Sequence, residues 1–397
     1  MFRIIDKQQL TPLIYSLWVE APRIAASAKP GQFLIVRTGE NGERIPLTIC
    51  DYNPVNGTVR IVVQIAGVSS NKICHLNVGD CLTDVAGPLG KPSDFMVIPE
   101  EDLKDKRYLF VAGGVGAAPV YPQAKYLHER GAYVDVIIGA RNKDLIIMAD
   151  EMRKVCTNLY ICTDDGSQGE KGVVTLLMER LCATAPTDTQ KGTMGANPGV
   201  FAPTDTQNGT EGAFPGDFAP TDTQKGTMGA NPGVSAPSGT QNGTEGAFPG
   251  DFAPSGTQNG TEGAFSGDFA SSGTQNGTEG AFSGDFAPSG TQNGTMGAVP
   301  YDMCVAIGPM IMMKFATLMA KKLGLPITVS LNTLMVDGTG MCGACRVSVA
   351  GKTMFACVDG PEFNGYDVDF DEALRRQTLY RTQEQEANAA AGLDLRR

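Results

Sequence analysis

The stretch YLFVAGGVGAAP at Tyr108–Pro119 decides the fold. Five mainly apolar residues run into a glycine-rich turn and then into a segment that favours helix, which is the strand, loop and helix order of a parallel α/β sheet. Gly114 and Gly116 let the backbone approach a dinucleotide pyrophosphate, and Pro119 opens the helix in place of the third glycine of the usual fingerprint. The segment therefore predicts a nucleotide-binding domain.

The same order recurs along the chain. VDVIIGA, YICTDDG and MCVAIGP at Met303–Pro309 are strands that run into glycine turns, and they alternate with predicted helices over Val120–Arg130, Val173–Cys182 and Met310–Leu323. PITVSL supplies a further strand. This alternation predicts a parallel sheet that is interrupted after Cys182 and resumes near Met303.

Two of the later turns are placed to touch a bound nucleotide. Gly139 and Arg141 follow the second strand and could meet the adenosine ribose, although Arg141 is equally explained as a solvated loop charge. After the later strand, Gly308, Pro309 and Met310 bring backbone close to the expected nicotinamide position. These residues do not distinguish NADH from NADPH.

The first hundred residues predict a small closed β-barrel, because the short apolar runs FLIVRT, RIVVQI and CLTDVAG are separated by turn clusters. In RIPLTI, Arg44 could pair with a phosphate while Thr48 bonds a flavin edge; the alternative is an edge strand with a solvated arginine. GVSSNK at Gly67–Lys72 could wrap a pyrophosphate at a helix start through Ser69 and Ser70, or could be an ordinary N-cap.

Seven tandem copies of a 17-residue unit fill residues 185–303. Each unit is rich in Gly, Thr, Pro, Asn and Asp and has few apolar side chains, so we predict disorder there. The unit is shorter than the usual solenoid repeats. Because the block interrupts a helix-to-strand connection, it should hang away from the strand ends where ligands bind. Loop closure over this length costs about 2 kcal/mol, so the fold should survive it.

Near the C-terminus, DGTGMCGACRV places Asp337, Cys342 and Cys345 at D-x4-C-x2-C spacing, and Cys357 follows after eleven residues. Plant-type [2Fe–2S] sites use C-x4-C-x2-C and a distant cysteine, so the pattern indicates such a site with aspartate as the first ligand. Two alternatives stay open. Three cysteines and a carboxylate could hold structural zinc, or Asp337 could be only a turn residue beside three cysteine ligands.

Composition excludes several classes of protein. Of the net charge of −11, residues 183–300 carry 11 acidic and 2 basic side chains, so the remainder is close to neutral and the acidic balance says nothing about partners. We expect no nucleic-acid partner. No apolar run is long enough for a membrane span, no signal segment opens the chain, and the other seven cysteines lack disulfide-like spacing. We therefore expect a cytoplasmic protein. With His75 and His128 as the only histidines, hydrolase triads and multi-histidine metal sites cannot be built.

The predicted organisation has five segments. They are an FAD-binding β-barrel at 1–98, a first part of the NAD-binding α/β domain at 99–183, disordered repeats at 184–300, a second part of the NAD-binding domain at 301–333, and a [2Fe–2S] module with a C-terminal helix at 334–397.

This order of barrel, nucleotide domain and cysteine module resembles the ferredoxin–NADP reductase superfamily, and most closely the small (alpha) subunit of NADH-dependent ferredoxin:NADP oxidoreductase, also called sulfide dehydrogenase subunit beta. The resemblance covers about 1–183 and 301–390 and includes CTDDGSQGEKG, AIGPMIMMK and DGPEFNGYDVDFDEA. It implies FAD at Arg44, Pro46, Leu47, Thr48, Val62, Val63, Gln64, Gly67, Ser69 and Ser70; NAD(H) or NADP(H) at Gly113, Gly114, Gly116, Ala117 and Pro119; and a [2Fe–2S] cluster on Asp337, Cys342, Cys345 and Cys357.

The resemblance implies a subunit that passes electrons from NAD(P)H through FAD and the cluster to a larger partner subunit with a second flavin and [4Fe–4S] clusters, and indirectly to ferredoxin. The electron-transfer subunit of dihydroorotate dehydrogenase is a related alternative, but it carries four cysteine ligands and usually Cys before Gly-Pro, where this chain has Asp337 and Ile307. A self-contained reductase and a zinc-bound scaffold without redox function are the other hypotheses.

Overall fold

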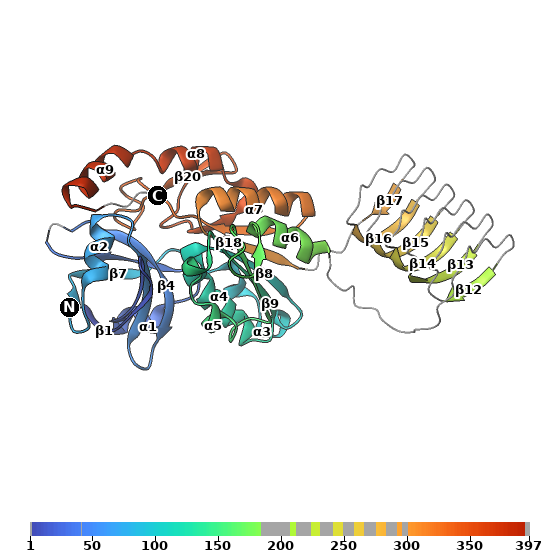
Figure 1. Ribbon diagram of the computed structural model, residues 1–397, viewed down its shortest axis with the longest axis horizontal. Coiled ribbons are helices and arrows are strands. Elements are labelled where there is room, and N and C mark those ends of the chain that lie inside the picture. The colour runs from blue at the N-terminus through green and yellow to red at the C-terminus, as the bar shows by residue number, and fades with distance from the viewer. Residues whose placement is uncertain are drawn as a thin grey trace. The chain divides into compact units, whose positions relative to one another are not determined.

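The computed structural model describes residues 2–40, 42–183 and 301–393, together with six short strands between 207 and 295. The chain divides into two compact units, 1–178 with 301–397 and 179–300. Figure 1 shows their elements along the chain.

The N-terminal part of the first unit is a nearly closed antiparallel barrel, as predicted. Its seven strands run in the order β6-β1-β2-β5-β4-β3-β7. Their bounds are β1 Phe2–Thr11, β2 Ile14–Glu20, β3 Phe33–Arg37, β4 Ile45–Asn53, β5 Thr58–Gln64, β6 Cys81–Leu82 and β7 Asp84–Leu89, with helices α1 Pro22–Ser27 and α2 Val68–His75 beside them.

Strand β3 shows how this barrel is filled. Leu34 and Val36 belong to the barrel core, whereas Phe33 and Ile35 alternate onto the opposite face and are buried there by other segments. A strand that is buried on both faces must therefore be covered from outside the barrel.

The predicted parallel sheet follows, with strand order β11-β10-β9-β8-β18-β19-β22. All neighbours pair in parallel except β22, which closes the edge antiparallel to β19. The bounds are β8 Arg107–Gly113, β9 Tyr133–Ala140, β10 Asn158–Thr163, β11 Glu170–Lys171, β18 Met303–Ile307, β19 Ile327–Ser330 and β22 Glu362–Asn364. The chain leaves β8 toward β9 and later returns beside β8 as β18, so the order reverses between these two strands.

Helices cover both faces of this sheet. Figure 1 shows α4 and α5 on one face and α6 and α7 on the other. Their bounds are α3 Glu100–Leu103, α4 Ala117–His128, α5 Ala149–Met152, α6 Val174–Ala183 and α7 Met310–Leu323. Helix α7 has the predicted limits, while α4 begins at Ala117, three residues before the predicted start, because Gly116 already has helical backbone angles.

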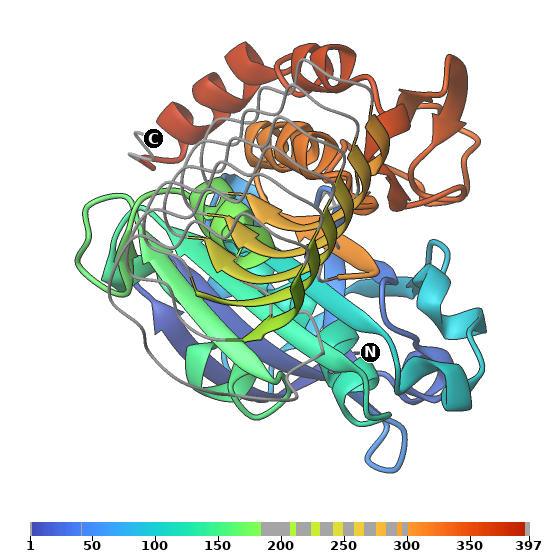
Figure 2. The same cartoon turned by 90° about the vertical axis from the view of Figure 1, so that its right-hand side faces the viewer.

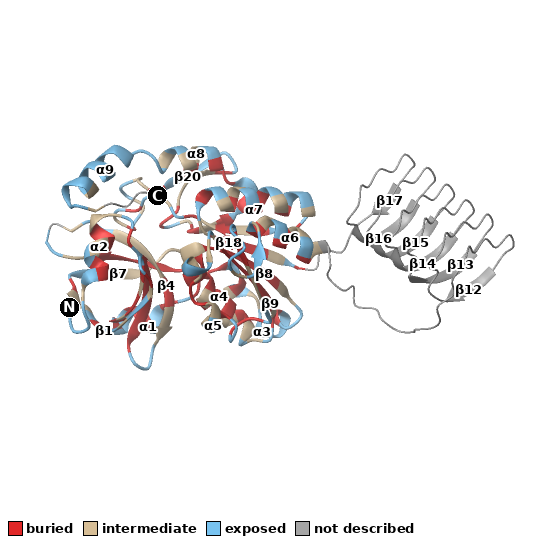
Figure 3. Cartoon of the chain, viewed as in Figure 1, coloured by how far each residue is buried: buried red, intermediate tan, exposed pale blue. Residues whose placement is uncertain are grey.

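The C-terminal segment wraps back from the sheet toward the barrel. It contains β20 Arg346–Val349, β21 Lys352–Phe355, the short turn Gly365–Asp367, α8 Phe370–Arg376 and α9 Arg381–Ala390. Because β22 pairs with β19, for example Phe363 with Val329, this segment is built into the edge of the nucleotide-domain sheet. Figure 3 shows burial concentrated in the strands, with α9 largely exposed.

Charged pairs join the barrel to the nucleotide domain. Arg60 on β5 donates from Nη2 to Glu151 Oε1 of α5 at 3.0 Å, and Lys125 on α4 lies 3.1 Å from Asp51 of β4. Arg60 is 5% exposed, so its guanidinium depends on this carboxylate and on Ser16 for its hydrogen bonds. The two domains are therefore held together by partly buried polar contacts as well as by apolar packing.

In the second unit, β12 Gln207–Glu211, β13 Gln224–Ala230, β14 Gln241–Phe248, β15 Gln258–Phe265, β16 Gln275–Phe282 and β17 Gln292–Thr295 form a parallel sheet. Neighbouring strands pair one repeat apart, as Gln241 with Gln258 shows. Sequence reasoning did not anticipate these strands, because no apolar alternation marks them. The predicted disorder covers all of 184–300, so these six strands (Figure 2) differ from it, and the rest of that range lies outside the described residues.

Candidate functional site

The glycine loops after β8 and β18 meet at the point where the strand order reverses. An added Cβ on Gly116 would lie 2.1 Å from the carbonyl oxygen of Ile307, and one on Gly113 would lie 2.9 Å from Cδ of Pro309. Gly308 in turn lies against the backbone of Gly113. Because ligands of open α/β sheets bind at such a switch point, this paired loop is the nucleotide-site candidate.

The loop has room on its outer side. Gly114 has φ of +55°, a backbone angle that favours glycine, and an added Cβ there would meet nothing within 4 Å. Ala117 and Pro119 lie in the first turn of α4, and Met310 opens α7. The structure thus brings together the predicted residues Gly113, Gly114, Gly116, Ala117, Pro119, Gly308, Pro309 and Met310.

The predicted ribose contacts lie one strand away. Gly139 on β9 lies against Val174 of α6, and a Cβ added to the glycine would lie 2.3 Å from Val174 Cγ1. This glycine is therefore required for packing α6 onto β9. Arg141 is exposed, and its guanidinium has no partner among the described residues. Both explanations of Arg141 therefore stand.

Strand β4 carries the predicted flavin contacts. It lies between β5 and β3, so the alternative of an edge strand is wrong. Despite this central place, Ile45, Pro46, Leu47 and Thr48 are all only half-buried. A central strand whose residues stay partly uncovered can seat a flat ligand, and exposed Arg44 at its start is free of described partners.

The start of α2 lies at the same end of β4. Ser69 donates to the carboxylate of Glu43, the residue before Arg44, which ties the α2 N-terminus to the strand. Ser70 is the third residue of α2, and its Oγ accepts the N–H groups of Ala66 and Gly67 at 2.8 and 3.0 Å, which is one half of a capping box. The Ser70 hydroxyl therefore caps the helix, and a pyrophosphate contact at the start of α2 stays a prediction.

The three side chains of the Val62–Gln64 stretch point into different environments. Val63 is in the barrel core, Val62 packs in the cluster shared with the nucleotide domain, and Gln64 is exposed. In this stretch, only the Gln64 side chain and the backbone can therefore reach a ligand in solvent.

We call residues 337–345 the cysteine loop. Together with Cys357, this loop supplies two pairs of potential ligands. Cys345 and Cys357 are both buried and their Sγ atoms lie 3.2 Å apart, which is too far for a disulfide. Two thiolates in one tetrahedral metal shell at about 2.3 Å from the metal would lie roughly 3.8 Å apart, so a small adjustment fits them to one metal ion. Cys342 is exposed, and its backbone N–H donates to the Asp337 carboxylate, so these two residues form the other pair.

Asp337 acts as a turn residue, because its carboxylate accepts backbone N–H groups of the loop that follows it. Its Oδ1 accepts the Thr339 N–H at 2.9 Å and its Oδ2 accepts the Cys342 N–H at 3.0 Å. These N–H bonds lower the pKa of Asp337, so the carboxylate is ionised and each oxygen keeps lone pairs for a cation. The turn therefore orients the carboxylate toward Cys342 without using up its ligand capacity.

Burial and the neighbouring Cys345 sulfur raise the pKa of Cys357. Within the ranges that the structure describes, no three His, Cys, Asp or Glu side chains converge closely enough to hold a single metal ion. Two separate pairs fit a two-iron cluster better than one tetrahedral zinc ion, which needs four donors around one point.

The cysteine loop packs directly on the barrel. Gly338 has φ of +76°, and an added Cβ would lie 2.7 Å from Leu89 and 2.9 Å from Ile35. Nearby, the Lys91 N–H donates to the Gly360 carbonyl at 2.7 Å. Since Ile35 pairs with Pro46 of β4, the loop and the candidate flavin strand flank the same strand, β3.

Sequence reasoning missed Glu362 on β22. Its Oε1 accepts from Gln123 Nε2 at 2.7 Å and from Ser93 Oγ at 3.1 Å, so it joins α4, the segment after the barrel and the C-terminal segment. The carboxyl borders a cavity of about 260 Å³ that is also lined by Phe95 and Tyr108. Burial raises the pKa of Glu362 to about 7. An acidic residue in the apolar setting of GPEF was the available signal.

Comparison with known proteins agrees with this geometry. Residues 332–369 match the family model of the iron–sulfur cluster binding domain of dihydroorotate dehydrogenase B. The chain is 33% identical to a Thermotoga maritima homologue of the dihydroorotate dehydrogenase B (NAD(+)) electron transfer subunit, over 96% of this chain and 92% of the relative. It is 39% identical to an uncharacterised Clostridium beijerinckii protein, over 98% and 93%.

Among solved structures, an NADH-dependent reduced ferredoxin-NADP oxidoreductase studied for flavin-based electron bifurcation is similar at 32% identity and a TM-score of 0.65, covering 98% of this chain and 97% of that one. No described helix is long and apolar enough to cross a membrane. FAD and a [2Fe–2S] cluster, the cofactors predicted from the sequence, are typical of these relatives. The chain belongs to the family of iron–sulfur flavoprotein electron-transfer subunits of ferredoxin reductase type that includes the homologue of the dihydroorotate dehydrogenase B electron transfer subunit.

Proposed function

We propose that this chain is the subunit that takes electrons from NAD(P)H and delivers them one at a time, through FAD and a [2Fe–2S] cluster, to a larger partner subunit. The observation that carries the proposal is the packing of Gly338 on Ile35, which seats the cysteine loop against the strand next to β4. The flavin strand and the cluster loop thus share one neighbour.

For the cluster, the proposed ligands are Asp337 and Cys342 on one side and Cys345 and Cys357 on the other. The 3.2 Å approach of the two buried sulfurs and the orientation of the Asp337 carboxylate toward Cys342 support this division. Three glycines in the loop have φ between +68° and +80°, which lets the backbone turn sharply around a compact group.

For the flavin, the chain offers the half-buried face of Pro46, Leu47 and Thr48, with Arg44 and the N-terminus of α2 for the phosphates. For the nicotinamide nucleotide it offers the paired loops at Gly113–Pro119 and Gly308–Met310. When bound, FAD accepts a hydride as two electrons and releases them singly, which is the form an iron–sulfur cluster can carry.

The residues of the chain hold the two sites in position. Backbone at Gly113 and Gly116 holds the two loops in contact, and the Arg60–Glu151 and Lys125–Asp51 pairs hold the nucleotide domain against the barrel. Fixing both domains fixes the donor and acceptor positions relative to each other, which is what rapid transfer requires.

Asp337 favours the NADH-dependent ferredoxin:NADP oxidoreductase type for this chain. That family carries one aspartate and three cysteines, whereas the dihydroorotate dehydrogenase type carries four cysteines and usually Cys where Ile307 stands. The family-model match and the Thermotoga relative keep the dihydroorotate dehydrogenase subunit as the second candidate.

Anaerobic purification with flavin, iron and zinc analysis tests the proposal. We expect FAD, iron without zinc, and reduction of an artificial dye by NADH or NADPH from the isolated chain. Reduction of ferredoxin should require the larger subunit. A colourless chain that holds zinc would contradict the proposal, and dye reduction that responds to dihydroorotate only in the presence of a partner would favour the second candidate.

A further inference from the structure

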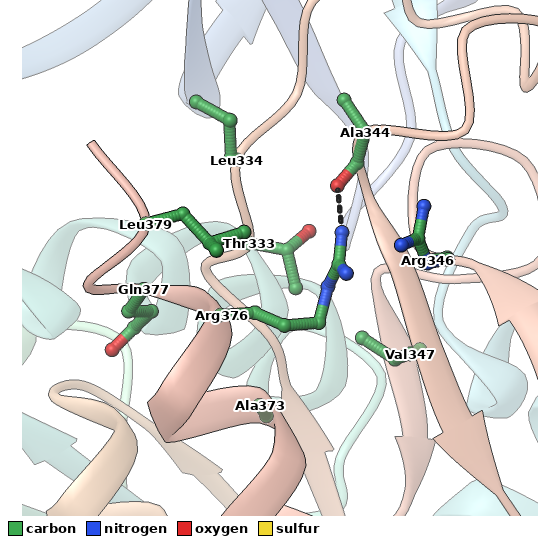
Figure 4. Close-up of a pocket in the computed structure, with 9 residues that line it drawn as sticks. All are labelled: Thr333, Leu334, Ala344, Arg346, Val347, Ala373, Arg376, Gln377 and Leu379. Atoms are coloured by element: carbon green, nitrogen blue, oxygen red, sulfur yellow. Dashed lines mark hydrogen bonds between the residues drawn. The ribbon is translucent and has the colours of Figure 1, made fainter.

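Helix α8 contacts the cysteine loop through one arginine. Arg376 Nη2 donates to the carbonyl oxygen of Ala344 at 3.0 Å, and Ala344 directly precedes Cys345 (Figure 4). One turn earlier, buried Ala373 anchors the same face of α8. The arginine therefore reaches the loop from a helix that is fixed by packing.

The space around this bond is too small for a ligand. The hollow between α8 and the loop measures about 20 Å³, which is room for roughly one water molecule. Figure 4 shows Arg376 crossing this hollow toward Ala344, with Thr333 beside it. The partner of this guanidinium is thus the loop itself.

The bond constrains the peptide that leads into Cys345. A peptide unit is planar and trans, so fixing the direction of the Ala344 carbonyl also fixes the Cys345 N–H, which points the opposite way. A hydrogen bond from a charged donor is roughly twice as strong as a neutral one and polarises the peptide further. The orientation of buried Cys345, whose sulfur lies beside Cys357, depends on this peptide.

We propose that Arg376 is a positioning residue that holds the Ala344–Cys345 peptide and, through its charge, favours the reduced form of the cluster. The inference rests on the proposed function, because it assumes that Cys345 is a cluster ligand. An electron added to the cluster adds negative charge, and a fixed cation a few bonds from a ligand stabilises that charge.

Arg375 provides a matched control. It is the adjacent residue on α8 and carries the same charge, but its side chain is exposed, so solvent screens it. Arg376→Gln and Arg375→Gln each remove one positive charge, and only the first removes the bond to Ala344. Arg376→Lys keeps the positive charge but replaces the planar guanidinium with an ammonium group.

Two readouts test the proposal. The first is the midpoint potential of the cluster, followed by EPR in the whole chain. Arg376→Gln should shift the ratio of reduced to oxidised cluster about tenfold toward the oxidised form. This shift corresponds to a fall of about 59 mV in the midpoint potential for one electron. Arg375→Gln should give a much smaller shift, and Arg376→Lys should lie nearer the wild type.

The second readout is amide hydrogen exchange of the 343–347 segment in the metal-free chain. Arg376→Gln should accelerate it about tenfold while Arg375→Gln leaves it unchanged. Equal shifts of potential in both glutamine variants, or wild-type exchange in Arg376→Gln, would overturn the proposal. A wild-type chain without a cluster would overturn the proposed function instead, and the exchange experiment would still decide whether Arg376 holds the loop.

Discussion

Ile35 on barrel strand β3 packs so closely on Gly338 that an added Cβ on the glycine would lie 2.9 Å from the isoleucine Cδ1. This contact seats the cysteine loop on the strand that pairs with Pro46. In the proposed arrangement, a short route between flavin and cluster depends on this contact.

Gly338→Ala should therefore displace the loop. The substitution adds a side chain at φ of +76° and against both Ile35 and Leu89, so we expect loss of most bound iron and lower thermal stability. Gly351→Ala is the matched control, because Gly351 has φ of +72° with nothing within 4 Å of an added Cβ. Backbone strain alone costs about 1–2 kcal/mol in both variants. Equal iron content in the two variants would contradict the loop packing.

Gly116→Ala should separate the two nucleotide loops. The added Cβ would meet the Ile307 carbonyl oxygen at 2.1 Å, which is a backbone atom that cannot rotate away. We expect the Kd for NADH, measured by fluorescence quenching, to rise at least about tenfold, equivalent to about 1.4 kcal/mol. Gly131→Ala, at φ of +83° in the turn before β9, controls for a general loss of stability, because it strains the backbone away from both loops. Similar binding by both variants would place the nucleotide elsewhere.

Glu151→Gln should loosen the junction between barrel and nucleotide domain. The change keeps the shape of the side chain but leaves buried Arg60 without a negative partner. Because the Glu151 side chain is 35% exposed and water can partly compensate, we expect a loss of about 2 kcal/mol in the free energy of unfolding by urea. Lys314→Gln breaks the exposed pair with Asp371 and should cost less than about 1 kcal/mol. A reversed order would show that the Arg60 pair is not structural.

Glu362 should make stability depend on pH. Burial raises its pKa from 4.5 to about 7, so the folded chain retains a proton that the unfolded chain releases. The free energy of unfolding should then fall as the pH rises from about 5 to 8, by about 2–3 kcal/mol.

Glu362→Gln should flatten this dependence and stabilise the chain above pH 7, whereas Glu386→Gln on exposed α9 should retain it. Urea unfolding at pH 5.5 and 8.5 measures the difference. A wild-type chain that is more stable at pH 8.5 would contradict the raised pKa of this carboxyl.

The sequence predicted those parts of the site that are local. A strand that runs into GGVG, a second that runs into IGP, and a C-x2-C loop carry their conformations in adjacent residues, and the structure has all three in the expected elements. Parallel-sheet rules then place the first two loops together, because adjacent strands end at the same edge.

The missed features depend on residues that are far apart in the chain. Ser93 and Glu362 lie 269 positions apart and meet only because β22 joins the edge of the sheet. Ser69 bonds Glu43, 26 positions away, and Arg376 reaches Ala344 from helix α8. Hydrophobic periodicity carries no information about such polar partners. The central place of β4 likewise follows from strand order, which RIPLTI alone does not reveal.

The most direct test of the electron path through flavin and cluster is the EPR spectrum of the isolated chain after anaerobic addition of NADH, compared between wild type and Asp337→Cys. We expect a reduced [2Fe–2S] signal in both chains, with changed g-values and a changed midpoint potential in the variant. Identical spectra would show that Asp337 is not a ligand. The absence of any signal from a folded, flavin-loaded wild-type chain would contradict the electron path itself.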